Sequence, residues 1–432
     1  MTSWSNWPGL STVTPTEVRA PRDSHDIVAA VERARERGST VKMTGTGHSF
    51  TGIAAPEGIM LSPAQLTGIV AVDREAMTVT ALAGTSLHAL NASLEALGLS
   101  LHNMGDIAEQ TVAGATATGT HGTGGVVASL SAQIAELELV TGKGELLRAS
   151  ETENPDVLAA ARVGLGALGI LTTITFRVEP IYTLEAHEFP LSWAEALDRF
   201  DELTAENHHF ELMFWFPHTD RTLAKALNRT LDDPAPLGRL RHWLDDDLLS
   251  NRVFAVVNRL GNSRPSWIPR INEVAGRALS ERTYSDVAHK VFASSRQVVF
   301  REMEYAVPRE VGLDALREVR RWIEASDLRI SFPVEVRTTP ADDITLSSSS
   351  GRDSMYLAFH VNAQTDHTAY FAGVEEILRG YDGRPHWGKL NTRTAADLEP
   401  AYPRWAELQS LRDRLDPDRL FTNDYLRRVL GD

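Results

Sequence analysis

The chain of 432 residues contains no cysteine, and this absence removes several kinds of chemistry at once. Disulfides, iron–sulfur clusters, zinc ribbons and thiol nucleophiles all require cysteine, so reactive groups must be histidine, lysine, arginine, carboxylates or a bound cofactor. Long apolar runs are also missing, because no window approaches the roughly 18 to 20 residues that span a bilayer. The first 15 residues lack the basic and apolar parts of an export signal. We therefore expect a cytoplasmic protein without an integral membrane segment.

Basic residues are outnumbered, with 43 lysines and arginines against 58 acidic residues and a net charge of −15. Such a charge repels phosphate backbones, so no nucleic-acid partner is expected, and solubility alone also accounts for it. Hydrophobic residues make up 42% and charged residues 23% of the chain, as in ordinary globular proteins. The length exceeds the size at which one core stops growing, which favours two domains.

Short apolar runs broken by glycine dominate residues 1–180 and indicate strands and turns. Later residues are more charged, and strand patterns return after residue 330. From these patterns we expect strands at 41–43, 77–82, 136–140, 210–216, 331–338 and 355–361, helices at 24–36 and 86–97, helical and connecting structure at 237–295, a mobile loop at 347–351 and a helical C-terminus.

Residues 44–50, Thr-Gly-Thr-Gly-His-Ser-Phe, follow the expected strand at 41–43 and are mostly small. Small residues let backbone N–H groups approach a ligand oxygen closely, which suits a pyrophosphate. The segment is not the GxGxxG dinucleotide fingerprint, because Phe50 stands at the third glycine position and no clear helix follows. By itself it is equally compatible with an ordinary tight turn.

A second segment, residues 111–125, has no side chain larger than valine apart from His121. We expect it to build no core and to offer threonine hydroxyls and free N–H groups to a large flat ligand. A flexible loop is the alternative. His121 is interpreted as structural or as part of a cofactor's surroundings.

Polar pairs mark two later strands. Glu335 and Arg337 are two residues apart, so they point to the same side of the strand, although such a pair is often only a solvated edge. His360 and Asn362 repeat the pattern, and the two strands could form one sheet with four polar groups on a face. Lys389, two residues after Trp387, adds a cation. His208, His209 and His218 lack a ligand pattern, so no metal is expected.

Three motifs together resemble the vanillyl-alcohol-oxidase class of FAD enzymes, at residues 45–49, 114–124 and 384–389. Within that class the chain is most similar to the aldonolactone oxidoreductases and alditol oxidases. The resemblance implies an α+β two-domain fold, with an FAD-binding domain at 1–180, a substrate-binding cap domain at 181–385 and a C-terminal segment, 386–432, that returns to the FAD domain.

The resemblance also implies that FAD is held by both small-residue segments. His48 matches the histidine that many members link covalently to the flavin, although some members lack the link. The cofactor-binding residues expected on this basis are Thr44, Gly45, Thr46, Gly47, His48, Ser49, Gly114, Thr118, Gly119, His121, Gly122 and Gly124.

Matching glutamate, arginine and lysine residues bind substrate in the family, and this carries catalytic roles onto Glu335, Arg337 and Lys389. Arg337 and Lys389 are expected to stabilise the oxygen of the carbinol being oxidised, while Glu335 orients an adjacent hydroxyl and helps to accept the proton. His360 and Asn362 are expected to bind substrate. Asn362 stands where the family varies, which leaves substrate choice open.

The expected reaction is FAD-dependent oxidation of a sugar-derived 1,4-lactone of the gulono- or galactono- type. Hydride would pass from the carbinol carbon to flavin N5, giving an ascorbate-type product, and O2 or another acceptor would take the electrons. One alternative is oxidation of the terminal CH2OH of an alditol. Two others, from different classes, are a flavin-binding protein without turnover and a nicotinamide-dependent enzyme.

Overall fold

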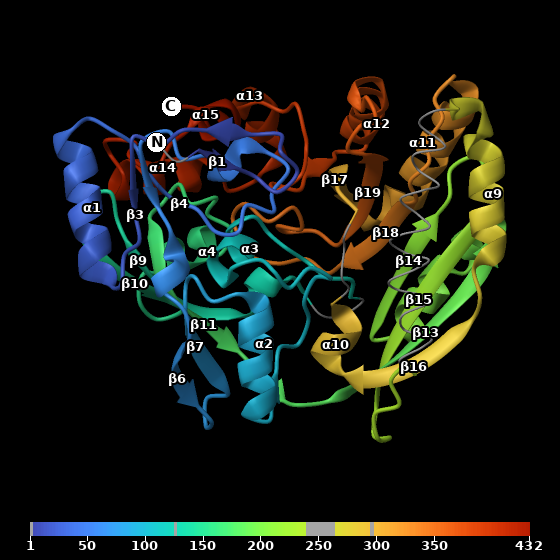
Figure 1. Ribbon diagram of the computed structural model, residues 1–432, viewed down its shortest axis with the longest axis horizontal. Coiled ribbons are helices and arrows are strands. Elements are labelled where there is room, and N and C mark those ends of the chain that lie inside the picture. The colour runs from blue at the N-terminus through green and yellow to red at the C-terminus, as the bar shows by residue number, and fades with distance from the viewer. Residues whose placement is uncertain (1–2, 125–127, 239–263, 294–297) are drawn as a thin grey trace.

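The computed structural model describes residues 3–124, 128–238, 264–293 and 298–432. Two layered units lie side by side in Figure 1: one is built from the N-terminal residues, and the other contains a large sheet from the later part of the chain. The C-terminal helices return to the first unit, so both termini lie close together on it. The boundaries at 180 and 385 stay predictions.

A small parallel sheet organises the first unit. Its strand order is β3 (Glu17–Arg19), β5 (Ile59–Leu61) and β4 (Val41–Met43). Helix α1 (Ser24–Glu36) connects β3 to β4, which is the crossover that parallel strands require. The side chain of Asp23 caps this helix by accepting a hydrogen bond from Asp26 N at 2.9 Å.

A five-stranded antiparallel sheet forms the second layer of this unit. Its order is β10 (Leu146–Ser150), β9 (Ile134–Val140), β11 (Ile170–Arg177), β7 (Thr78–Leu82) and β6 (Ile69–Asp73). The helices of this unit are α2 (Leu87–Ala96), α3 (Val112–Ala117) and α4 (Pro155–Ala161). Two minor strand pairs complete it, β1 (Trp4–Ser5) with β2 (Thr12–Val13) and β8 (Leu99–Ser100) with β12 (Glu179–Pro180).

The second unit is an eight-stranded sheet. Its order is β16 (Arg282–Val287), β13 (Thr183–Ser192), β15 (Arg221–Thr230), β14 (His209–Trp215), β18 (Val334–Thr339), β19 (Ser354–Asn362), β17 (Phe300–Pro308) and β20 (Arg384–Pro385). The helices of this unit are α5 (Trp193–Asp198), α6 (Phe200–Glu206), α9 (Ile268–Ala278), α10 (Ala288–Phe292), α11 (Gly312–Ala325) and α12 (Thr368–Gly380).

The two faces of the large sheet differ in chemistry because alternate residues of each strand point to opposite sides. Val334 and Val336 of β18 are fully buried in one core cluster with residues of α11 and α12, which cover the outer face. Glu335 and Arg337, between and after these valines, lie on the other face. That inner face points toward the first unit in Figure 1.

Three C-terminal helices pack onto the first unit: α13 (Ala395–Leu398), α14 (Trp405–Leu415) and α15 (Asp424–Leu430). Leu408 and Leu426, on α14 and α15, belong to the same core cluster as Val79 and Leu90. In the part of the chain that the structure describes, no helix combines the length and apolarity needed to cross a bilayer.

The sequence predictions of the helix at 24–36 and the strand at 41–43 are confirmed at both ends. Residues 347–351, expected to form a mobile loop, lie outside the named helices and strands, but Ser347 to Ser350 are buried, and Ser349 Oγ lies 2.6 Å from Thr339 Oγ1. Much of the predicted region 237–295 lies outside the described residues. Its described part contains helices and also strand β16, which the sequence did not predict.

Candidate active site

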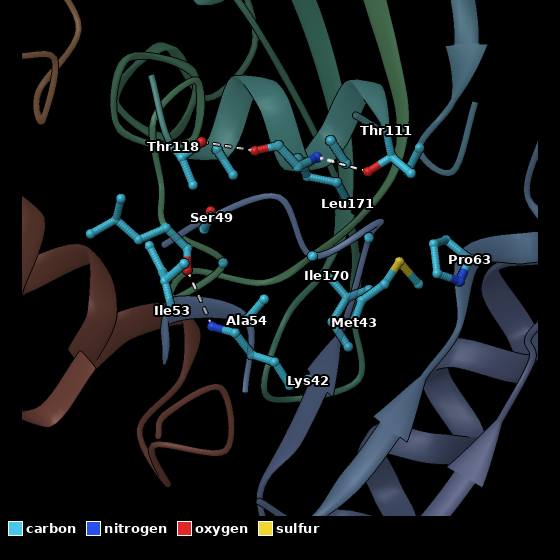
Figure 2. A pocket seen from close by; sticks show the side chains of 18 of the residues that line it. Lys42, Met43, Ser49, Ile53, Ala54, Pro63, Thr111, Thr118, Ile170 and Leu171 are labelled. Carbon is cyan, nitrogen blue, oxygen red and sulfur yellow. Dashed lines mark hydrogen bonds between the residues drawn. The ribbon is translucent and has the colours of Figure 1, made fainter. Parts of the chain in front are cut away.

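A cavity lies where strand β4 meets helix α3 (Figure 2). The walls come from β4 with the loop after it, from the α3 segment and from the loop that precedes β11. The residues include Gly45, Thr46, Gly47, His48, Ser49, Gln110, Thr111, Ala113, Gly114, Ala117, Thr118, Leu165, Gly166, Gly169, Ile170, Leu171 and Phe421.

The first small-residue segment contributes five consecutive lining residues, 45–49. Within the described ranges, none of their backbone N–H groups donates a hydrogen bond to the protein. A methyl group on Gly45 would lie 2.5 Å from Thr111 Oγ1, so only glycine allows the two segments to approach this closely. Thr44 is buried behind the cavity and does not line it, and its Oγ1 has no hydrogen-bond partner in the described part of the chain.

The second segment folds into the short helix α3 and a loop, which corrects the expectation that it builds no core. Val112 and Ala115 are fully buried in the main core cluster, while Gly114 and Thr118 line the cavity from the other side of the helix. Because α3 packs against the core on one side and borders the cavity on the other, its side chains must be small. Of the cofactor residues expected here, Gly119, His121, Gly122 and Gly124 do not line the cavity.

His48 stands at the edge of the cavity, half-buried against the ring of Trp7. The two ring centroids are 5.7 Å apart with an interplanar angle of 24°. Burial lowers the pKa of His48, and the cation of Lys389 adds to this effect. A largely neutral imidazole therefore faces the cavity.

Arg337 on β18 is held by two carboxylates on the inner face of the large sheet. Its Nη2 donates to Glu335 Oε2 at 2.7 Å and its Nε donates to Glu211 Oε2 at 2.9 Å. Asp106 Oδ2 lies 3.9 Å from the guanidinium. Burial alone lowers the pKa of Arg337, but the carboxylates outweigh it and raise the pKa well above its ordinary value. The predicted Glu335–Arg337 pair is therefore a buried ion pair and not a solvated edge.

Lys389 is the second cation, and it contacts Glu302 of β17. His360 of β19 lies on the same carboxylate, with its Nε2 3.4 Å from Glu302 Oε1, while its Nδ1 lies 3.1 Å from the carbonyl oxygen of Pro333. Burial opposes ionisation of all three groups. The mutual attraction outweighs burial, raising the pKa of Lys389 and of His360 and lowering that of Glu302 well below its usual value.

The inner face of the sheet meets the cavity at its His48 end. Phe50 N donates to the carbonyl oxygen of Gly388 at 2.7 Å, and Lys389 Nζ lies 5.2 Å from the centroid of the Phe50 ring. Gly124 N donates to the carbonyl oxygen of Thr338, the residue after Arg337, at 3.0 Å. Lys389 thus lies near the His48 end of the cavity, and Asp106 acts both on Lys389, through space, and on Arg337, at 3.9 Å.

Asn362 is placed differently from the other expected residues. It is the last residue of β19, and its Oδ1 accepts a hydrogen bond from Gln364 N at 3.0 Å in the following turn. Trp215 and Trp387 are packing residues, each fully or almost fully buried, and Trp387 Nε1 donates to Leu346 O at 2.7 Å.

Sequence reasoning missed three carboxylates of the site: Asp106, Glu211 and Glu302. Glu302 lies in the run Glu302-Met303-Glu304-Tyr305 of β17. Its alternation of acid and apolar residues, with Met303 and Tyr305 buried in the outer-face core, was the available signal. Asp106 carried no such signal, because it lies in a loop.

His121, Glu304 and His386 form a buried cluster whose ligand atoms all lie within 4.8 Å of one another. His121 Nε2 is 3.2 Å from Glu304 Oε1, and the centroid of the His121 ring lies 3.8 Å from that of Tyr356 at an interplanar angle of 34°. Gly388 N donates to His386 Nδ1 at 3.1 Å, which places the proton of a neutral His386 on Nε2. No lone pair of His386 then faces the cluster, so we assign no metal to it.

Fold and site together define an FAD-dependent oxidoreductase that acts on CH–OH groups. Residues 15–150 match the family model of the FAD binding domain, and residues 174–429 match that of D-arabinono-1,4-lactone oxidase. The free N–H groups of residues 45–49 and the glycine approach at Gly45 fit a cofactor with a diphosphate. The chain belongs to the D-arabinono-1,4-lactone oxidase family.

Relatives span the whole chain. L-gulono-1,4-lactone dehydrogenase of Mycobacterium tuberculosis (strain H37Rv) is 42% identical, with 99% of each chain covered. Alditol oxidase of a Streptomyces species is 32% identical over 99% of both chains, and L-gulonolactone oxidase of Mus musculus is 30% identical, with 99% of this chain and 98% of the relative covered. A crystal structure of cholesterol oxidase from B. sterolicum has the same fold, with a TM-score of 0.84 at 18% identity over 99% of this chain and 96% of that one. The predicted α+β FAD-binding fold is confirmed.

Proposed function

We propose that the protein oxidises a carbinol carbon of a sugar-derived 1,4-lactone of the gulono- or galactono- type, giving an ascorbate-type product. The observation that supports the proposal is the pair of largely buried cations, Arg337 and Lys389, each held by carboxylates and both within reach of the charge of Asp106. The family membership and the 42% identical lactone dehydrogenase support the substrate class.

Each residue has a role that its surroundings support. Bound FAD supplies the hydride acceptor, at flavin N5. Arg337 and Lys389 keep their charge under all ordinary conditions, so they are suited to stabilise the developing alkoxide. Glu335 orients an adjacent hydroxyl and helps to accept the proton. His360 binds substrate beside Glu302, and Asn362, at the end of the same strand, acts as an outer contact.

Oxidation of an alditol is the second candidate, because the 32% identical relative from Streptomyces is an alditol oxidase. Steady-state kinetics on matched panels separates the two. We expect L-gulono- or L-galactono-1,4-lactone to give a kcat/KM at least about tenfold above that for xylitol or sorbitol. Activity on the alditols alone would overturn the proposal. Bleaching of the flavin by a lactone without oxygen would exclude a binding protein without turnover.

We also propose a covalent link between His48 and FAD. The largely neutral imidazole at the cavity edge supports it, because an unprotonated nitrogen must form the bond. Acid precipitation of the protein should leave yellow colour in the pellet. The His48→Ala variant should release all its colour to the supernatant. Colour released equally by both proteins would show that FAD is bound without a link. The remaining cofactor contacts are proposed for residues 45–49, Gly114 and Thr118, which line the cavity. For Thr44, Gly119, His121, Gly122 and Gly124, which do not line it, a contact with FAD stays a prediction from the family resemblance.

The setting of the reaction is also part of the proposal. We place the enzyme in the cytoplasm, without a nucleic-acid partner, in keeping with the net charge of −15. Electrons leave the reduced flavin to O2 or to another acceptor. Comparing the rates at which air and a dye reoxidise the reduced enzyme distinguishes an oxidase from a dehydrogenase.

A further inference from the structure

Lys42 is a buried lysine in the wall of the FAD cavity, and the reaction proposed above does not use it. It is the middle residue of β4, just before the 44–49 segment, and only 6% of its surface is exposed. Its Nζ donates to the carbonyl oxygen of Leu165 at 3.2 Å. Figure 2 shows Lys42 on one side of the cavity, with Thr111 and Thr118 on the other.

The ammonium group of Lys42 has N–H donors that make no hydrogen bond within the described part of the protein. An ammonium carries three N–H donors, and within the described residues one of them has a partner, the Leu165 carbonyl. No carboxylate of the described chain pairs with it, because Asp416 and Glu57 act on it only through space. Burying a cation without a counter-ion costs free energy, so an unpaired lysine inside a protein is unusual.

The charge balance of the cavity points to what Lys42 binds. Among the described lining residues, it is the sole lysine or arginine, and no aspartate or glutamate accompanies it. The FAD diphosphate is an anion, and the N–H groups of residues 45–49 supply dipoles but no net charge. The required positive charge is absent from this cavity unless Lys42 provides it.

We propose that Lys42 binds the diphosphate of FAD and supplies the positive charge that holds it. Lys42 thus determines cofactor affinity, while Arg337 and Lys389 act on the substrate. This role depends on FAD binding alone and not on the identity of the substrate, so a failure of the lactone proposal leaves it intact.

A pH dependence follows from the same geometry. Burial lowers the pKa of Lys42 to about 7 in the protein without cofactor, and Asp416 and Glu57 oppose this only in part. A bound diphosphate raises that pKa, so FAD binding takes up a proton above about pH 7. The dissociation constant of FAD should then rise by up to about tenfold per pH unit above pH 7, and should be flat below it.

The test measures FAD binding without turnover, in the His48→Ala background, so that affinity is non-covalent whether or not the link exists. His48 is also the other titratable residue that lines the cavity, so this background removes its titration. The cofactor-free, full-length Lys42→Met and Lys225→Met variants are compared by fluorescence titration with FAD, ADP and riboflavin. Lys225 is a matched control, because it is equally buried, donates to a carbonyl oxygen (Val291, 3.4 Å) and lies in the large sheet.

We expect Lys42→Met to weaken FAD and ADP by about 30-fold or more and to abolish their pH dependence. Riboflavin, which lacks phosphate, should bind as before, and Lys225→Met should leave all three affinities within about threefold. If Lys42→Met fails to fold, the pH dependence of FAD binding to the His48→Ala protein still tests the proposal. A flat series, or a Lys42→Met protein that loses thermal stability but keeps its affinity for ADP, would overturn the proposal.

Discussion

His386 is a buried imidazole that stays neutral far below the pH at which an exposed histidine takes up a proton. Burial lowers its pKa to about 3, although Glu304 works in the opposite direction. Its Nδ1 accepts the N–H of Gly388, the residue before Lys389, so the neutral ring helps to position the loop that carries Lys389. Protonation would place a donor against that N–H group.

The sign of the resulting pH effect follows from which state binds the proton. Between pH 6.5 and the folded pKa, the unfolded chain protonates this histidine and the folded protein does not, so stability falls as the pH falls. Going from about pH 7 to about pH 5, we expect wild type to lose about 2 kcal/mol more unfolding free energy than His386→Asn, measured by urea denaturation. His88→Asn, at an exposed position, should behave like wild type. Equal losses in all three proteins would contradict the neutral imidazole.

At the scale of elements, Asn423 connects the last helix, α15, to the turn beside the cavity. Asn423 is fully buried, and its Oδ1 caps α15 by accepting Leu426 N at 2.9 Å. Its Nδ2 lies 3.0 to 3.1 Å from the carbonyl oxygens of Gly52, Ile53 and Ala55, in the short turn beside the cavity. The C-terminal segment therefore stabilises the loop that follows the first small-residue segment.

Asn423→Ala should lower the unfolding free energy by about 2 to 4 kcal/mol, because it removes the cap and the donor to the carbonyl groups of Ile53 and Ala55, while Gly52 O keeps the N–H of Ala55. Asn423→Asp keeps the cap but turns an acceptor toward those carbonyls, so it should be at least as destabilising. Ser192→Ala, which removes a helix cap alone, should cost about 1 kcal/mol. Thermal and urea unfolding measure all three. An Asp variant as stable as wild type would show that the carbonyl contacts contribute little.

The elements that the sequence predicted well are those whose pattern is local. Helix 24–36 has its cap residue and helical apolar spacing, and strand 41–43 is a short apolar run ended by glycine. Helix α3 was missed because its small residues carry no apolar period, yet Val112 and Ala115 fill core space. The burial of the serines at 347–350 was not predicted, because a sequence does not show which hydroxyls find partners inside the protein.

At the scale of the whole molecule, the site joins residues that are far apart in sequence. The two-residue spacing of Glu335 and Arg337 correctly predicted that they share a face. It could not predict that β18 lies between β14 and β19, because strand order depends on long-range pairing. Glu211 and Glu302 therefore remained unassigned, although they hold Arg337 and Lys389 in the folded protein.

The excess of acidic residues also looks different in the folded molecule. The net charge of −15 describes the chain as a whole, but Arg337 and Lys389 are two largely buried cations, each paired with carboxylates. Their partner carboxylates fix the positions of both cations and raise the pKa of each. The account depends on these two cations acting on the oxygen of the substrate, next to the flavin.

The measurement that tests this most directly is the rate of flavin bleaching by L-gulono-1,4-lactone in anaerobic stopped-flow, comparing wild type with Lys389→Met. The account predicts a rate constant lower by about 10²- to 10³-fold, because one donor to the developing alkoxide is lost. Thermal stability should fall, because Glu302 loses a buried partner, but flavin content at the assay temperature should stay close to that of wild type, and Lys389→Arg should recover part of the rate. A fully folded, flavin-loaded Lys389→Met enzyme that bleaches as fast as wild type would contradict it.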